Sequence, residues 1–146
     1  RAYLALVHGN VAQDRGFVEA PIGRHPLHRQ RMAVVSRGGK NAFTHFRVVE
    51  RFGDFTLLEC RLETGRTHQI RVHMAHIGHP VVGDPVYGPK RCPFNVGGQL
   101  LHAYVLGFIH PGTGEYMEFR ADPPEDMQEV LETLRRRAVS PLGSAR

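Results

Sequence analysis

The chain has little of what several protein classes require. It contains no tryptophan, two cysteines and three serines, and it has no apolar run near the roughly 18 residues that a membrane-spanning helix needs. Cys60 and Cys92 form no CxxC pair, so neither a zinc knuckle nor a disulfide framework is indicated. No serine lies in a GxSxG motif, which argues against a serine hydrolase. We therefore expect a cytoplasmic protein that is not bound to membranes.

What is present is typical of one globular domain. Hydrophobic residues make up 41% and charged residues 23% of the 146 positions, and a chain of this length buries roughly 70% of its unfolded surface when it folds. Residue 1 is not methionine and already reads as the interior of a strand. We therefore expect a fragment whose N-terminal part is missing, with a domain over residues 1–138 and a flexible tail over residues 139–146.

Positive charge is concentrated in the first three quarters of the chain. The net charge is +5, and arginine outnumbers lysine by 17 to 2, a bias that suits forked contacts with phosphate. Residues 1–114 carry a net charge of +7, whereas residues 115–146 carry −2. A surface that binds polyanions is therefore expected in the first part.

Hydrophobic periodicity predicts an α+β fold. Short apolar runs and turn residues indicate strands or extended segments over residues 3–7, 16–22, 32–35, 42–50, 55–62, 100–109 and 116–120. Spacings of four and three between Ile70, Met74 and Ile77 predict a helix with Thr67 as its N-cap and Gly78 as its stop. A second helix is expected over residues 124–137. The strands come mostly as hairpins, which favours a mixed, largely antiparallel sheet with flanking helices.

The densest polar cluster, residues 63–73, runs from the end of a predicted strand into a predicted helix. A helix start offers unpaired N–H groups, and Arg66 and Arg71 add positive charge, so this segment suits an anionic ligand. Arg71 lies at the edge of the apolar stripe, where its guanidinium needs a partner. One alternative stays open at this point, because Arg71 could pair with a nearby carboxylate only to tie the helix to the sheet.

Two other readings of reactive residues are weaker. His68, His73, His76 and His79 lack the spacing of a metal site and have no acid among them, so we expect no metal. Cys60 near a strand end is expected to be a buried structural residue rather than a nucleophile.

The stretch over residues 24–40 is a better candidate for a functional site, because it has five basic residues and no acid, and arginine-rich hairpins contact RNA phosphates.

The sequence over residues 62–80 and 83–88 resembles the RluA/RluC/RluD family of RNA pseudouridine synthases. The core of the resemblance is Arg-Thr-His-Gln-Ile-Arg at residues 66–71, followed by Gly-Asp-Pro-Val-Tyr-Gly at residues 83–88. It extends to residues 3–5, 21–26, 29, 32–34 and 101–103 and to the last helix, with the greatest similarity to RluD-type members that act on large-subunit ribosomal RNA. The resemblance implies the catalytic fold of this family, with its N-terminal part missing.

The implied activity is an isomerase that converts specific uridines in RNA, expected in 23S-type ribosomal RNA, to pseudouridine without cofactor or metal, and that acts as a monomer. The family's nucleophile is an aspartate in a His-Arg-Leu-Asp segment upstream of the tyrosine strand. This chain has no such segment, and Asp14, Asp54 and Asp84 do not match it. We therefore expect the nucleophile in the missing part and no activity from this fragment alone.

Family roles carry over to specific positions. Tyr3 corresponds to the tyrosine that packs against the target base, and Arg71 to the arginine that pairs with the nucleophilic aspartate; Ile70 and Leu101 are expected to line the pocket. Charge and placement add the candidate RNA contacts Arg24, His25, Arg29, Arg31, Arg66, His68 and Gln69. The competing hypothesis is a non-catalytic RNA-binding fragment or a degenerate relative without the nucleophile.

Overall fold

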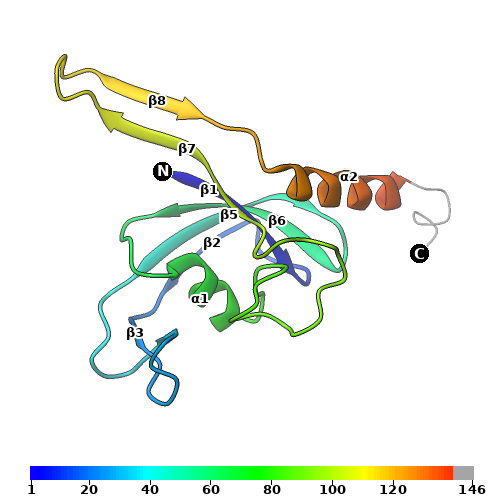
Figure 1. The fold of residues 1–146 in the computed structure, drawn as a ribbon, viewed down its shortest axis with the longest axis horizontal. Coiled ribbons are helices and arrows are strands. Elements are labelled where there is room, and N and C mark those ends of the chain that lie inside the picture. Colours follow the sequence, from blue (N-terminus) through cyan, green and yellow to red (C-terminus); the bar gives the residue numbers. More distant parts are fainter. Residues whose placement is uncertain (140–146) are drawn as a thin grey trace.

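The computed structural model describes residues 1–139 as a six-stranded sheet, a separate two-stranded ribbon and two helices (Figure 1). The strands are β1 (Ala2–His8), β2 (Arg15–Glu19), β3 (Ile22–Arg24), β4 (Met32–Val34), β5 (Phe43–Arg51), β6 (Phe55–Leu62), β7 (Leu101–Ile109) and β8 (Tyr116–Arg120). The helices are α1 (Gln69–His76) and α2 (Glu125–Val139). Every strand pairing recorded between these strands is antiparallel, so the predicted α+β class and largely antiparallel sheet are confirmed.

The first strand of the chain lies in the middle of the sheet. The strand order is β2-β5-β6-β1-β7-β8, and β1 pairs with β6 along its whole length, from Ala2 opposite Arg61 to His8 opposite Phe55. The predicted hairpin of β5 and β6 is confirmed, with Gly53 at φ 85° in its turn, a conformation that glycine adopts without strain. On its other side β1 pairs with β7, which carries the chain back along the sheet.

The two helices pack on opposite faces of the sheet. Successive side chains of a strand point to opposite faces, and in β1 the side chains of Ala5 and Val7 join the core under α1, which contributes Ile70 and Met74. Leu6, from the same strand, joins a second core with α2, whose buried residues are Met127, Val130, Leu131 and Leu134. No helix within residues 1–139 is long and apolar enough to cross a membrane.

Three predicted boundaries are corrected. Helix α1 begins at Gln69 rather than after an N-cap at Thr67, because His68 takes a left-handed conformation at φ 55° and ψ 25° that sets the entry of the chain. Helix α2 includes Val139, so the tail does not begin there; residues 140–146, also assigned to the tail, lie outside the described part. The extended stretch 16–22 is two strands, β2 and β3, separated at Ala20 and Pro21.

The C-terminal stop of α1 at Gly78 is confirmed and has a Schellman geometry. The N–H of Gly78 donates to the carbonyl of Ala75, and the N–H of His79 donates to that of Met74. Gly78 has φ 85°, which a residue with a side chain adopts only at a cost. This stop turns the chain toward residues 80–90, the loop that supplies the partner of Arg71.

The hairpin of β7 and β8 reaches away from the rest of the sheet (Figure 1). Ala2 pairs with Val105, and beyond this point β7 pairs with β8. Among the hairpin side chains that the structure describes, the large apolar ones of Phe108, Ile109, Tyr116 and Phe119 are exposed. Strand β8 is one edge of the six-stranded sheet, and β2 is the other.

Candidate active site and nucleic-acid interface

Arg71 is held by a buried carboxylate of the same chain. Its Nε donates to Oδ2 of Asp84 at 2.8 Å and its Nη2 donates to Oδ1 at 2.9 Å, the forked geometry of a strong ion pair. The Arg71 side chain is 10% exposed and that of Asp84 is fully buried. The sequence left open whether Arg71 pairs with a nearby carboxylate of this chain. The acceptor is Asp84, a residue that sequence reasoning had set aside.

The loop that carries Asp84 is shaped around this carboxylate. Burial opposes ionisation of Asp84, but hydrogen bonds from Arg71 and from the backbone N–H groups of Tyr87 and Val86 outweigh it and lower its pKa. The preceding Gly83 has φ 80°, and a Cβ there would lie 2.4 Å from the carbonyl oxygen of Gly98. Only glycine fits this position, which fixes the approach of the loop to α1.

His68 and Tyr87 link the start of α1 to the hairpin of β3 and β4, which lies in the basic stretch over residues 24–40 and is called the basic hairpin below. The hydroxyl of Tyr87 lies 2.8 Å from Nδ1 of His68 and accepts a hydrogen bond from the N–H of Met32 in β4. Burial, followed by the charge of Arg71, lowers the pKa of His68 and so favours its neutral imidazole. The guanidinium of Arg71 also lies over the Tyr87 ring, 5.1 Å from its centroid. These contacts keep His68 in its strained left-handed conformation beside Arg71.

Gln69 organises the segment before α1 from inside the protein. Its Oε1 accepts hydrogen bonds from the N–H of Arg66 and the hydroxyl of Thr64, and its Nε2 donates to Phe43 and Thr44. The residue is 2% exposed. The structure thus places the Gln69 amide under the surface, where it positions Arg66, while His68 lies at the surface.

Tyr3, Ile70 and Leu101 meet in one apolar cluster. Ile70 is 4% exposed and belongs to the core between α1 and the sheet, and the half-buried Tyr3 and Leu101 pack against that core from β1 and β7. Ile70 and Met74, which belong to the apolar stripe of the predicted helix, both face the core. The structure thus brings Ile70 of α1 together with two strands that are distant from it in sequence, whereas the contacts of Arg71 are with Asp84 and Tyr87.

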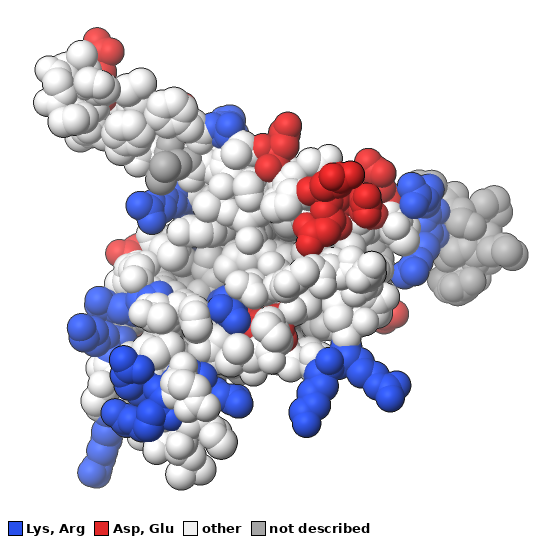
Figure 2. Space-filling view, in the orientation of Figure 1, with Lys and Arg blue, Asp and Glu red and all other residues white. Residues whose placement is uncertain are grey.

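Six of the seven predicted RNA contacts lie on β3, in the turn between β3 and β4 or on the segment before α1; the seventh, Gln69, is 2% exposed, so its prediction as an RNA contact is corrected. Arg24 and Arg66 line one pocket of about 350 Å³ together with Lys40. Arg24 donates to the carbonyl of Arg29, which ties the turn over residues 25–31. Figure 2 shows lysine and arginine gathered over this hairpin, at the lower left, and acidic side chains gathered near α2. His25, Arg29 and Arg31 lie in or next to that turn, where Nδ1 of His25 accepts the N–H groups of Leu27 and His28.

The histidines of the α1 region have separate partners. His73 is fully buried and lies between the Thr44 hydroxyl and the carbonyl of Ala20, where burial lowers its pKa. His79 donates to the carbonyl of His8. Within residues 1–139 no group of three or more histidine, cysteine, aspartate or glutamate side chains is arranged to hold a metal ion. Burial raises the pKa of Cys60 to about 12, so its thiol stays protonated, in agreement with the structural role expected for it.

Sequence reasoning missed the roles of Asp84 and Tyr87. Both belong to the Gly-Asp-Pro-Val-Tyr-Gly segment that carried part of the family resemblance, so a signal for their importance was present. Their contact with α1 could not be predicted, because Asp84 lies 13 positions after Arg71, beyond the end of α1 and the turn that follows it.

Comparison with known proteins identifies relatives over nearly the whole chain. The family model described as RNA pseudouridylate synthase matches residues 1–76. An uncharacterized RNA pseudouridine synthase of Bacillus subtilis, YlyB, is 61% identical over 136 residues, which are 93% of this chain and 44% of that protein. Ribosomal large subunit pseudouridine synthase D of Nitrosomonas europaea is 51% identical over 142 residues, covering 92% of this chain and 41% of the relative.

A solved structure has the same fold. Human RNA pseudouridylate synthase domain containing 1 superposes with a TM-score of 0.70 at 28% identity, over 92% of this chain and 64% of that one. The chain therefore spans less than half the length of the bacterial relatives named above and about two thirds of the human structure.

Proposed function

Because the chain belongs to the RNA pseudouridylate synthase family, we propose that the full-length protein converts uridine in RNA to pseudouridine. The observation that carries this proposal is the match over residues 1–76, which contains both Tyr3 and Arg71. Large-subunit ribosomal RNA is the proposed substrate, on the strength of relatives named ribosomal large subunit pseudouridine synthase D, such as that of N. europaea at 51% identity.

The reaction breaks the bond between the ribose C1′ and N1 of the base, rotates the base and forms a bond from C1′ to C5. The hydrogen on C5 leaves as a proton, and N1 gains one, so there is no net oxidation or reduction. The proposed nucleophile is an aspartate of the full-length protein outside these 146 residues. A carboxylate attacks only when ionised, and a neighbouring arginine favours that form.

Asp84 is not suited to be this nucleophile. Its two oxygens receive four hydrogen bonds, two from Arg71 and two from backbone N–H groups, and its side chain is fully buried. A carboxylate so enclosed has no open path to a ribose carbon. Its proposed role is to hold the guanidinium in one orientation.

Arg71 retains donors for a second carboxylate. A guanidinium carries five N–H groups in a fixed fork, and the pair with Asp84 uses one on Nε and one on Nη2. The remaining N–H groups are free of that pair and can hold the nucleophilic aspartate. Tyr3, half-buried against the cluster that contains Ile70, offers a flat ring for the flipped uracil.

The basic hairpin is proposed to hold the RNA backbone. Arg24 and Arg66 line one pocket beside Lys40, and Arg29 and Arg31 belong to the same turn of chain. Contacts with phosphates give affinity without reading the sequence. We further propose that the protein is a monomer and that it is cytoplasmic; the free thiols of Cys60 and Cys92 support the second proposal, because they suit a reducing compartment.

The test uses the full-length protein and an unmodified transcript of large-subunit ribosomal RNA. Pseudouridine is mapped by its carbodiimide adduct, which stops reverse transcription, with small-subunit ribosomal RNA and transfer RNA as comparison substrates. We expect stops at one or a few uridines of the large-subunit transcript. Binding without any new stop would favour the alternative, a non-catalytic RNA-binding protein, and the absence of a His-Arg-Leu-Asp segment upstream of Tyr3 in the gene would point the same way.

A further inference from the structure

The sheet face opposite α1 carries a row of exposed aromatic and basic side chains that the proposed reaction does not use. Phe17 on β2 pairs with His45 on β5, which pairs with Arg61 on β6, so the three stand in one line across the strands. The neighbouring line is formed by Arg15, Arg47 and Glu59. Helix α2 covers the other end of this face, over Leu6 and Leu57.

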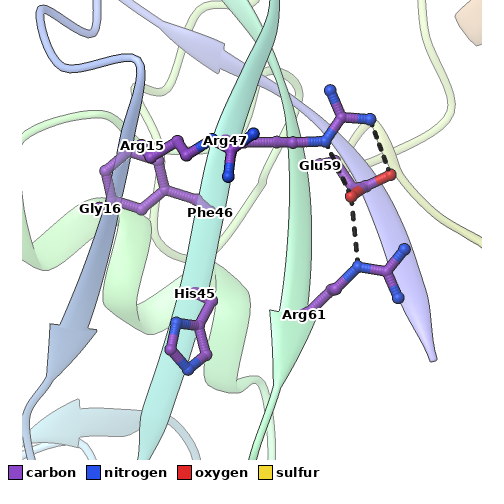
Figure 3. A pocket seen from close by; sticks show the side chains of 7 residues that line it. All are labelled: Arg15, Gly16, His45, Phe46, Arg47, Glu59 and Arg61. Carbon is purple, nitrogen blue, oxygen red and sulfur yellow. Dashed lines mark hydrogen bonds and ion pairs between the residues drawn. The ribbon is translucent and has the colours of Figure 1, made fainter.

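A buried carboxylate fixes two of these arginines. Glu59, whose side chain is 6% exposed, accepts two hydrogen bonds from Arg47 at 3.0 and 3.2 Å and one from Nε of Arg61 at 3.3 Å (Figure 3). Burial opposes its ionisation, but the hydrogen bonds from Arg47 and Tyr104 and the charges of both arginines lower its pKa to about 2. The carboxylate is therefore ionised at neutral pH and holds both guanidinium groups in place.

These side chains surround a pocket of about 460 Å³. It is lined by Arg15, Gly16, His45, Phe46, Arg47, Glu59 and Arg61 (Figure 3). Three arginines and one buried glutamate leave the pocket positive. Arg61 donates one N–H to Glu59, and its side chain is 59% exposed, so its other N–H groups face solvent. This arrangement suits a phosphate, which arginine can bind with two parallel hydrogen bonds.

An aromatic platform lies beside the pocket. The rings of Phe17 and Phe43 are stacked, with centroids 5.0 Å apart and planes at 12°, and His45 lies 4.7 Å from Phe43. Phe17 is 61% exposed, although a phenylalanine gains free energy by being covered. Exposed rings interleaved with arginines on a sheet are how proteins bind unpaired nucleotides, with bases stacked on rings and phosphates on cations.

We propose that this face is a second nucleic-acid site that holds single-stranded RNA, with a base stacked on Phe17 and a phosphate between Arg15 and Arg61. Single-stranded RNA fits better than a duplex, because the bases of a duplex are already stacked on one another. The choice of RNA as ligand rests on the proposed function. The site lies on the face away from α1 and Arg71, so it serves RNA next to the target uridine and not the uridine itself.

The test measures binding of a fluorescent 12-nucleotide oligoadenylate to the full-length protein, because this RNA contains no uridine for the catalytic site. Phe17→Leu removes the ring and keeps an apolar side chain, and Arg15→Gln removes a charge without touching the Glu59 ion pairs. Phe119→Leu and Arg136→Gln are the matched controls, since both residues are exposed on other parts of the molecule.

We expect Phe17→Leu to weaken binding roughly fivefold or more, as loss of one stacked base does. Arg15→Gln should lower the magnitude of the salt slope by about 0.7, the value for one contact with a single strand. The affinities of the two control variants should stay within roughly twofold of that of the unmodified protein.

Equal affinities for Phe17→Leu and Phe119→Leu, or no binding of oligoadenylate by the unmodified protein, would overturn the inference. A protein partner would then remain as the occupant of this face. Pseudouridine formation is measured separately, so its absence despite oligoadenylate binding would refute the proposed function alone.

Discussion

Replacement of Arg71 separates a structural role from a catalytic one. Removal of one partner from a buried ion pair costs about 3–5 kcal/mol. Arg71→Ala leaves the Asp84 carboxylate buried but still bonded to the N–H groups of Val86 and Tyr87. We therefore expect the lower end, about 3 kcal/mol of lost unfolding free energy, measured by urea denaturation of the full-length protein.

The effect on chemistry should exceed what stability explains. Without the guanidinium, the nucleophilic aspartate loses the charge that favours its ionised form and the donors that orient it. We expect the single-turnover rate of Arg71→Ala to fall roughly 100-fold or more under conditions where the variant stays folded. Arg71→Lys keeps the charge but not the fork, so it should recover part of the stability and only part of the rate.

Asp84→Asn supplies the comparison that decides between the two roles. The asparagine oxygen can still accept the N–H groups that Oδ1 of Asp84 accepts, while the charge opposite Arg71 is lost. If Arg71 acts on a second carboxylate, this variant should lose stability but retain more of its rate than Arg71→Ala. If the single-turnover rates of all three variants fall in proportion to their losses of unfolding free energy, the reasoning is refuted. Arg71 would then only connect α1 to the loop that carries Asp84.

Three further outcomes are expected. The 146-residue chain by itself should form no pseudouridine in ribosomal RNA, because the proposed nucleophile lies outside it; turnover by the purified fragment would sink that assignment. Arg29→Ala and Arg31→Ala should each reduce the magnitude of the salt slope for RNA binding by about one unit or slightly less, and an unchanged slope would exclude the basic hairpin as a phosphate contact. The pKa of Glu59 is lowered to about 2 from a usual value of 4.5, so the ionised carboxylate contributes its full share of the unfolding free energy above pH 4.5 and loses it as the pH falls toward 2. The unfolding free energy of Glu59→Gln should therefore fall less over this pH range than that of the unmodified protein.

Local sequence signals were sufficient for most of the strands and helices. The hairpin of β5 and β6 was predictable because two β-rich segments flank a Gly-Asp turn, and the end of α1 because Gly78 follows the last apolar residue of its stripe. The start of α1 was placed too early. Thr67 has the chemistry of an N-cap, but the side chain of Gln69 and the left-handed backbone of His68 determine where the helix begins.

Contacts between distant segments could not be predicted from the sequence. The pair of Arg71 and Asp84 depends on how the Gly83 loop folds back, which a single sequence does not specify. The line of Phe17, His45 and Arg61 requires the register of three strands, and a shift by one residue would turn each side chain to the other face. The family resemblance supplied the roles proposed for Tyr3 and Arg71, which composition and periodicity alone could not.

Release of the C5 hydrogen is the most direct measure of the central claim, that the site around Tyr3 and Arg71 serves uridine isomerisation. Formation of the bond from C1′ to C5 displaces this hydrogen, so large-subunit ribosomal RNA labelled with tritium at C5 of uridine should lose label to water. We predict stoichiometric release at the modified positions with the full-length protein and at least a roughly 100-fold slower release with Arg71→Ala. Binding of the RNA by the folded full-length protein with no release of tritium, or equal rates for the two proteins, would contradict the account.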